Sequence, residues 1–243
     1  MLRAVVFDFD GVLVDSEPLH FRCFRQLGAE LGASLDYQTY LQTYIGFDDR
    51  DAFRHMLTGR AEPADADLEQ RIATLIERKH ELFQQLAAEG ADPIPGAWPL
   101  AHEITRALPT AVASGASAGE IALMLAGLGE GGRFDIIVSA DDVARSKPDP
   151  KSYALAVARL AREKGPADLA PAQCLAIEDT PTGLASAKAA GLATLAVATT
   201  RPTSELAEAE ADRVVETLEG VSLADLQAWF GAEAPRRPSS DNP

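Results

Sequence analysis

Two carboxylates, Asp8 and Asp10, follow the apolar run at residues 4–7 near the start of the chain. Alternate residues of an extended strand point to the same side, so both side chains can reach one point in space. Two carboxylates at the end of a buried strand are unfavourable unless a cation or a proton compensates their charge. Because Mg²⁺ takes carboxylate, phosphate and water oxygens as ligands, the pair predicts a magnesium site. On its own, such a pair is also typical of an acidic loop.

A serine and a lysine stand at comparable positions further along the chain. Ser114 ends the apolar run at 110–114 and precedes Gly115, and its hydroxyl and the N–H groups of a turn can hold an anion. Lys147 precedes Pro148 and a helix start, and its mobile point charge suits a phosphate oxygen. Taken singly, the serine fits a turn or a helix cap equally well, and the lysine fits an ordinary exposed position.

A second acidic pair, Glu178 and Asp179, follows the apolar run at 174–177. It repeats the unfavourable arrangement of the first pair. If the two pairs face each other, one divalent cation compensates both. The alternative is a surface pair that caps the following helix.

The elements that must position these residues form an alternating pattern. Short apolar runs of strand length are separated mostly by helical stretches, which predicts an α/β fold with a parallel sheet. Two helix starts are marked by a cap followed by proline, Asp149 with Pro150 and Thr180 with Pro181. The polar motifs therefore fall at the carboxyl ends of strands, where open α/β sheets bind ligands. The runs that we interpret as strands are 4–7, 110–114, 136–139, 174–178 and 194–198.

Residues 16–92 interrupt this pattern with amphipathic helical stretches and no strand-like run. The Pro- and Gly-rich segment at 91–96 is typical of a linker. We predict a helical cap at 16–92, inserted into a Rossmann-like catalytic core made of 1–15 and 93–233. The polar, Pro-rich end at 234–243 predicts a disordered tail.

Composition excludes several classes of function. The chain has 243 residues, with 37 acidic against 22 basic side chains and a net charge of −15, which argues against nucleic-acid and membrane-surface partners. Its two cysteines, Cys23 and Cys174, form no metal-binding or disulfide pattern. No signal peptide or membrane-spanning run is recognisable. We expect a cytoplasmic monomer.

Together, and in this order, the motifs resemble those of the haloacid dehalogenase superfamily of phosphohydrolases. The resemblance covers nearly the whole chain except the tail. It implies a Rossmann-like core with a helical cap inserted after the first strand, in agreement with the pattern above. Ala116 stands where many members have a polar residue, which puts a secondary phosphate contact in doubt. The matching segments are 8–16 (DFDGVLVDS), 113–115 (ASG), 146–150 (SKPDP) and 177–183 (IEDTPTG).

The resemblance also implies the roles of single residues. Asp8 would be the nucleophile and Asp10 the general acid and base, while Ser114 and Lys147 would hold the phosphoryl group. The Mg²⁺ site would comprise Asp8, Asp10 through its backbone carbonyl, and the second acidic pair. In that pair Asp179 completes the site and Glu178 supports it.

The subgroup with a small helical cap, around β-phosphoglucomutase and related sugar-phosphate phosphatases, is the most similar. It implies substrate contacts from His20, Arg50, Lys79 and Gly115. Lys79 interrupts the apolar face of its helix, which a purely structural residue rarely does. For His20 and Arg50, a solvated helix position remains the alternative.

We therefore predict a Mg²⁺-dependent phosphatase that hydrolyses a small phosphorylated metabolite, such as a sugar phosphate, through an aspartyl-phosphate on Asp8. A phosphomutase shares the first half-reaction and remains the alternative. A dehalogenase would leave two acidic pairs without a compensating cation. A catalytically silent phosphate-binding module is disfavoured, because every reactive position is filled.

Overall fold

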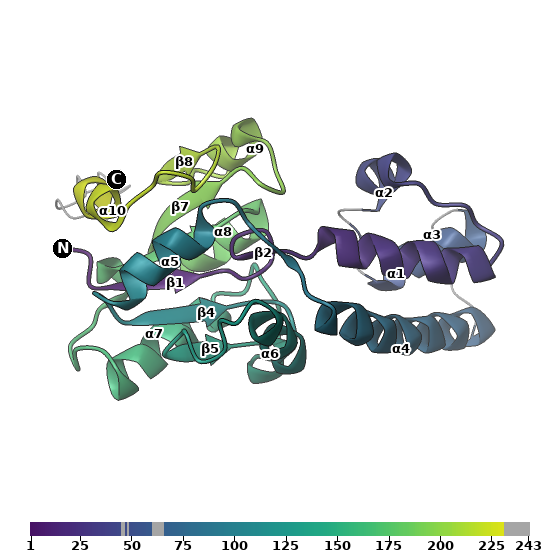
Figure 1. Ribbon diagram of the computed structural model, residues 1–243, viewed down its shortest axis with the longest axis horizontal. Helices are drawn as coiled ribbons and strands as arrows, with labels where there is room; N and C mark the ends of the chain where they lie inside the picture. Colours follow the sequence, from purple (N-terminus) through teal and green to yellow (C-terminus); the bar gives the residue numbers. More distant parts are fainter. Residues whose placement is uncertain (45–46, 48, 60–65, 231–243) are drawn as a thin grey trace, which may run out of the picture. The chain divides into compact units, whose positions relative to one another are not determined.

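The computed structural model describes residues 1–44, 47, 49–59 and 66–230, which form two compact units (Figure 1). The first unit contains Met1–Asp15, Pro93–Ala122 and the chain from Glu130 onward. The second contains Ser16–Asp92 and Leu123–Gly129. The predicted tail at 234–243 lies outside the described residues.

A six-stranded sheet forms the centre of the first unit, in the order β5-β4-β1-β6-β7-β8. Every neighbouring pair is parallel, so the predicted α/β fold is confirmed. All strands therefore end at the same edge of the sheet. The strands are β1 (Ala4–Phe7), β4 (Thr110–Ala113), β5 (Ile136–Val138), β6 (Cys174–Glu178), β7 (Ala193–Val197) and β8 (Arg213–Val215).

Both faces of the central strands are buried, which explains why they are apolar without alternation. Val6, Ala111 and Ala176 belong to one core cluster together with residues of α7 and α8. Their strand neighbours, such as Val5 and Leu175, point to the opposite face and are also fully buried. The ends of these strands are thereby fixed in a rigid frame.

Helices and 3₁₀ turns connect the strands of this unit. The α7 helix differs by one residue from its predicted start, because Pro150 and not Asp149 is the N-cap. Asp149 instead accepts a hydrogen bond from the backbone N–H of Lys151 at 3.0 Å. The predicted cap at Thr180 is confirmed, since its side chain accepts from the N–H of Gly183. The helices that lie wholly in this unit are α5 (Ala97–Thr105), α7 (Lys151–Glu163), α8 (Pro181–Ala189), α9 (Thr203–Glu208) and α10 (Leu223–Phe230), with 3₁₀ turns at Ala140–Asp142 and Pro171–Gln173. The residues of α6 (Ala118–Gly127) are divided between the two units.

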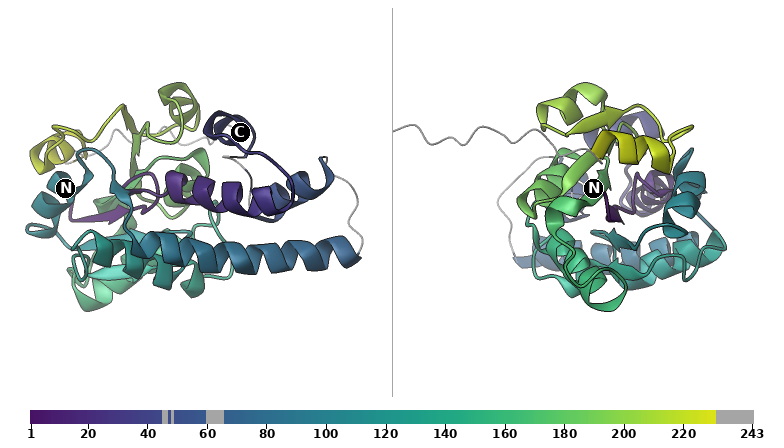
Figure 2. Two further views of the ribbon diagram at one scale, coloured as in Figure 1. Left: turned by 45° about the vertical axis from the view of Figure 1, so that its right-hand side comes forward. Right: turned by 90° about the vertical axis from the view of Figure 1, so that its left-hand side faces the viewer.

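The second unit is helical, and its long helix α4 lies beside α1 (Figure 2). Its core is rich in aromatic residues, including Phe24, Tyr40 and Phe53. At the sequence boundaries between the two units, β2 (Val14–Asp15) pairs with β3 (Asp92–Pro93) in a short ladder. The helices are α1 (Glu17–Glu30), α2 (Tyr37–Thr43), α3 (Asp49–Thr58) and α4 (Ala66–Ala88).

Within the described part of the chain, no helix has the length and apolar character needed to cross a membrane. Both cysteines are buried free thiols.

The α7 helix offers a test of how much the sheet depends on its packing. Leu160 is fully buried in the core cluster, whereas Leu155 on the same helix is only partly buried. We expect Leu160→Ala to lower the free energy of unfolding by about 2–5 kcal/mol, through lost contacts and a residual cavity. Leu155→Ala should lower the free energy of unfolding by clearly less, because its side chain is only partly buried. Urea unfolding of both variants measures the difference, and equal losses would contradict this account of the core.

Candidate active site

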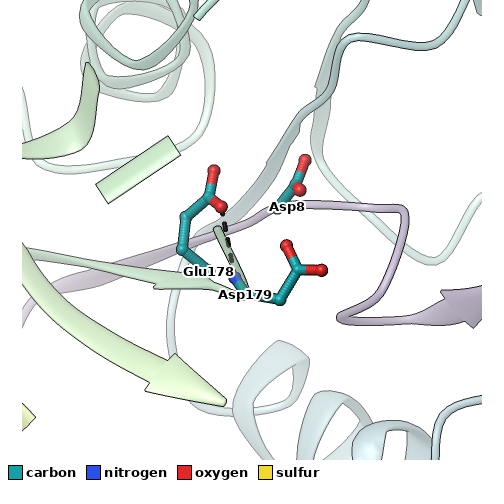
Figure 3. Close-up of side chains that lie close together, drawn as sticks. All are labelled: Asp8, Glu178 and Asp179. Carbon is teal, nitrogen blue, oxygen red and sulfur yellow. Dashed lines mark hydrogen bonds between the residues drawn. The ribbon is translucent and has the colours of Figure 1, made fainter. Parts of the chain in front are cut away.

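Three buried carboxyl groups meet where β1 and β6 end. Asp8 directly follows β1, and Glu178 is the last residue of β6. The two strands are hydrogen-bonded neighbours, and the Asp8 N–H extends their ladder by donating to the Ile177 carbonyl at 2.9 Å. One oxygen from each of Asp8, Glu178 and Asp179 lies within 4.8 Å of the others (Figure 3).

One ammonium group lies against two of these carboxylates. Lys147 Nζ donates to Asp8 Oδ1 at 2.7 Å and to Glu178 Oε1 at 2.6 Å. Its side chain is only 12% exposed, and that of Glu178 is fully buried. The loop before α7 thus brings a cation to the ends of β1 and β6, although Lys147 is 139 residues from Asp8 in the sequence.

The protonation of the cluster reflects its burial and its surplus of negative charge. Burial, together with repulsion from Glu178, raises the pKa of Asp8 to about 7. Burial and repulsion from Asp8 raise the pKa of Asp179 well above its ordinary value. Burial opposes the charged form of Lys147, but Asp8 and Glu178 together raise its pKa, so it stays an ammonium. One ammonium cannot compensate three carboxylates, and a further cation would relieve the repulsion.

Asp179 provides the observation that tests whether a metal fits. Its Oδ1 atom is buried and has no hydrogen-bond partner among the described residues, whereas its carboxyl group has a hydrogen bond with Thr200. A buried carboxylate oxygen without a donor is costly unless a cation lies against it. The all-oxygen character of the cluster suits Mg²⁺, so the residues fit a divalent cation.

Glu178 is bound differently from the other two carboxylates. Its Oε1 accepts from Lys147 and from the Tyr153 hydroxyl, both at 2.6 Å. Its Oε2 accepts from the Asp179 N–H and the Thr180 hydroxyl, both at 3.2 Å. Each carboxylate oxygen has two lone pairs, so the four protein donors already occupy all four lone pairs of the Glu178 carboxylate. The predicted support of a metal by Glu178 would therefore be indirect, with Asp8 and Asp179 as the open ligands.

Asp10 and Ser114 lie next to each other at the ends of neighbouring strands. The Ser114 hydroxyl donates to Asp10 Oδ2 at 3.4 Å and accepts from the Ala116 N–H at 2.9 Å. Ser114 directly follows β4, the other neighbour of β1. The structure thus brings together the predicted core residues Asp8, Asp10, Ser114, Lys147, Glu178 and Asp179, with Gly115 adjacent to Ser114.

Residues 2–191 match the haloacid dehalogenase-like hydrolase family. The chain belongs to this family.

Curated and solved relatives agree with the assignment. Protein CbbY of Cereibacter sphaeroides is 37% identical over 201 residues, covering 79% of this chain and 82% of that protein. Fructose-1-phosphate phosphatase YqaB of Escherichia coli is 28% identical, covering 77% and 92%. A CbbY variant of Rhodobacter sphaeroides, solved in complex with xylulose-1,5-bisphosphate, is similar with a TM-score of 0.73 at 31% identity, covering 93% and 99%.

The other residues predicted to bind substrate lie in the helical unit. The His20 ring stacks on the Phe83 ring, with 4.5 Å between the two ring centres. The His20 Nδ1 atom is buried and has no hydrogen-bond partner among the described residues. Burial, aided by the charge of Lys79, lowers the pKa of His20 to about 3, so the ring is neutral. Lys79 is itself buried and forms an ion pair with Asp49. Arg50 is exposed and forms an ion pair with Glu69.

Sequence reasoning missed several residues of this haloacid dehalogenase-like site. Tyr153 has the sequence spacing of a core residue on an amphipathic helix, and this spacing gives no indication of its hydrogen bond to Glu178. Thr200 follows β7, and no polar motif marked it. Gly183 was recognised only as part of the motif, but an added Cβ there would lie 2.0 Å from the Glu178 carboxyl group.

Gly183 yields a prediction about this packing. Gly183→Ala places a methyl group against the Glu178 carboxylate, and we expect a loss of about 1–3 kcal/mol in the free energy of unfolding from overpacking. Gly119 in α6 is the matched control, because nothing lies within 4 Å of its added Cβ. Gly119→Ala should be neutral or stabilising by up to about 1 kcal/mol. Urea unfolding compares the two, and a Gly183→Ala protein as stable as the control would refute the steric argument.

Proposed function

We propose that this haloacid dehalogenase-like hydrolase is a Mg²⁺-dependent phosphatase that forms an aspartyl-phosphate on Asp8. The observation that carries the proposal is the pairing of Asp8 with Lys147, beside the open oxygen of Asp179. A carboxylate next to a cation, at the end of a buried strand, can approach an anionic phosphate that would otherwise be repelled.

Phosphoryl transfer depends mainly on positioning and on charge compensation. Asp8 and Asp179 would hold Mg²⁺ together with the backbone carbonyl of Asp10, and the ion when bound would neutralise charge on the phosphoryl oxygens. Lys147 and the Ser114 hydroxyl would hold the phosphoryl group. A carboxylate oxygen of Asp8 forms a bond to phosphorus as the bond between phosphorus and the leaving oxygen breaks. The reaction is thereby divided into two easier steps.

Asp10 would serve both steps as a proton carrier. As a carboxylic acid it donates its proton to the leaving oxygen of the substrate. As a carboxylate it then takes a proton from the water that attacks the aspartyl-phosphate, which releases inorganic phosphate and restores Asp8. Such general acid–base help is typically worth about 10²–10⁴-fold in rate. The hydrogen bond from Ser114 to Asp10 supports a fixed position for this carboxyl group.

A small phosphorylated metabolite, and specifically a sugar phosphate, is the proposed substrate. Support comes from the fructose-1-phosphate phosphatase and from the CbbY variant with bound xylulose-1,5-bisphosphate. Within the proposal, residues 16–92 are the cap, and His20, Arg50, Lys79 and Gly115 contact the substrate. The carboxylate partners of Lys79 and Arg50 reduce the positive charge that either can offer. A neutral His20 suits a sugar hydroxyl. We also propose a monomer in the cytoplasm, with which the two free thiols are consistent.

Phosphate release from a panel of sugar phosphates and small phosphorylated acids, with Mg²⁺ and with EDTA, tests the proposal. We expect Mg²⁺-dependent release from at least one compound, and a loss on the order of a thousandfold or more in Asp8→Asn, because an amide is no nucleophile. Asp168→Asn is the control, since Asp168 is an exposed carboxylate paired with Arg3, and it should retain full activity.

Two results would contradict the phosphatase. A fully active Asp8→Asn protein would exclude the aspartyl-phosphate. Conversion of a hexose 1-phosphate to its 6-phosphate without phosphate release would identify a phosphomutase.

Metal binding should depend on pH, because protons compete for the same carboxylates. The folded pKa of Asp8, about 7, lies above its ordinary value of 3.8. In the metal-free protein the folded state therefore binds this proton more tightly, and its stabilising contribution is lost as pH rises from about 4 to 7. A divalent cation replaces the proton above this window. We expect Mg²⁺ to raise the Tm at pH 8, by about 2–4 °C per kcal/mol of binding free energy, and to raise it less at pH 5.5.

Asp179→Asn provides the control for this thermal measurement, with ionic strength held constant by NaCl. Removing one charged ligand should abolish most of the Mg²⁺-induced shift at pH 8. An equal shift in the variant and the wild type would show that the ion binds elsewhere.

A further inference from the structure

Tyr153 connects the core of the first unit to the proposed active site. It lies in the first turn of α7 and belongs to the core cluster under the sheet, where its side chain is fully buried. Its hydroxyl group lies 2.6 Å from Glu178 Oε1. Burial raises the pKa of Tyr153 further above its ordinary value, and nearby carboxylates act in the same direction, so the phenol keeps its proton.

The chemistry of its two neighbours fixes the direction of this hydrogen bond. Lys147 Nζ lies 3.4 Å from the Tyr153 oxygen and 5.0 Å from the centre of the ring. An ammonium can only donate, and an ionised carboxylate can only accept. The Tyr153 O–H therefore donates to Glu178 and turns a lone pair toward Lys147. The ring face adds a cation–π attraction to the same ammonium.

This arrangement holds both members of the ion pair between Lys147 and Glu178. Lys147 has a long flexible stem, so its ammonium position depends on the groups that accept its hydrogen bonds. Glu178 is one of these acceptors, and Tyr153 donates to the same Glu178 oxygen to which Lys147 is bound. Loss of the hydroxyl would leave Oε1 with a single donor and Lys147 with one acceptor fewer.

We propose that Tyr153 is a positioning residue for phosphoryl transfer, acting through Glu178 on Lys147. This inference rests on the proposed phosphatase function, in which Lys147 holds the phosphoryl group. Tyr153 touches no reacting atom. Its role is to keep the ammonium where charge on the phosphoryl oxygens must be compensated, an interaction that matters most in the transition state.

Tyr153→Phe separates this role from simple filling of the core, because the ring stays and only the hydroxyl is lost. We expect kcat to fall about tenfold, as for the loss of a hydrogen bond to a charged group, while KM changes by less than about twofold. The Kd of orthovanadate, measured by titration calorimetry with Mg²⁺ present, should rise about tenfold, because vanadate imitates the transferring phosphoryl group. The Mg²⁺ concentration for half-maximal activation should stay the same.

The helical unit offers a matched control. Tyr40 is also buried, and its hydroxyl donates to the Glu17 carboxylate. Tyr40→Phe therefore removes the same kind of hydrogen bond without touching Glu178 or Lys147. We expect kcat and vanadate affinity to stay within about twofold of the wild type, with a loss of stability similar to that of Tyr153→Phe in urea unfolding.

A double variant tests whether the effect passes through Glu178. In a Glu178→Gln background, Tyr153→Phe should reduce kcat by less than about twofold further, because the coupled partner is already changed. Equal reductions in both backgrounds would overturn the proposed route. Wild-type kcat and vanadate affinity in Tyr153→Phe, in a preparation whose wild type releases phosphate, would overturn the inference alone. Absence of phosphate release by the wild type across the whole panel would overturn the proposed function, and the inference with it.

Discussion

The contact of the Lys147 ammonium with Asp8 and Glu178 is the interaction on which the rest of the site depends. Three carboxyl groups are buried within 4.8 Å of one another, an arrangement that is unstable without nearby positive charge. Lys147 compensates part of it, while burial, together with the repulsion that remains, raises the pKa values of Asp8 and Asp179. This surplus of negative charge favours the binding of a further cation between Asp8 and Asp179.

The parallel sheet brings the charged and polar groups of the site together. Since β4, β1 and β6 are neighbours and parallel, Ser114, Asp8 and Glu178 come to the same edge. Both faces of the strands are buried, so the backbone positions are set by packing rather than by the charged groups. Glycines then allow the close approaches. Gly11 has a φ of 73°, and an added Cβ would lie 1.9 Å from Asp179 Oδ2.

Much of this could be predicted from the sequence, because strand ends carry a local signal. An apolar run followed by acidic residues located Asp8, Glu178 and Asp179, and the parallel order of the strands follows from their alternation with helices. The predicted start of α7 was wrong by one residue, since Asp149 accepts a hydrogen bond from the N–H of Lys151 but Pro150 is the N-cap.

The contacts of Tyr153 and Thr200 could not be predicted in the same way. Tyr153 is 25 residues from Glu178 in the sequence, and its helical spacing is that of any core residue. Thr200 follows β7, where no neighbouring acidic or glycine-rich pattern marks the loop. Such contacts are set by the tertiary placement of separate elements. The sequence pattern of Tyr153 therefore indicated its packing in the core but not its hydrogen bond to Glu178.

The net charge of −15 explains why the positive charge of this site must be local. A strongly acidic surface repels anions at long range, so electrostatic steering cannot bring a phosphorylated ligand to the site. That repulsion is screened within about 8–10 Å at physiological ionic strength, whereas interactions between buried groups are screened much less. The Lys147 ammonium, which is buried beside Asp8, therefore attracts an anionic ligand only after the ligand has entered the site. In such a protein, affinity for an anion has to come from close contacts, so within the proposed mechanism the position of Lys147 matters more than additional lysines on the surface.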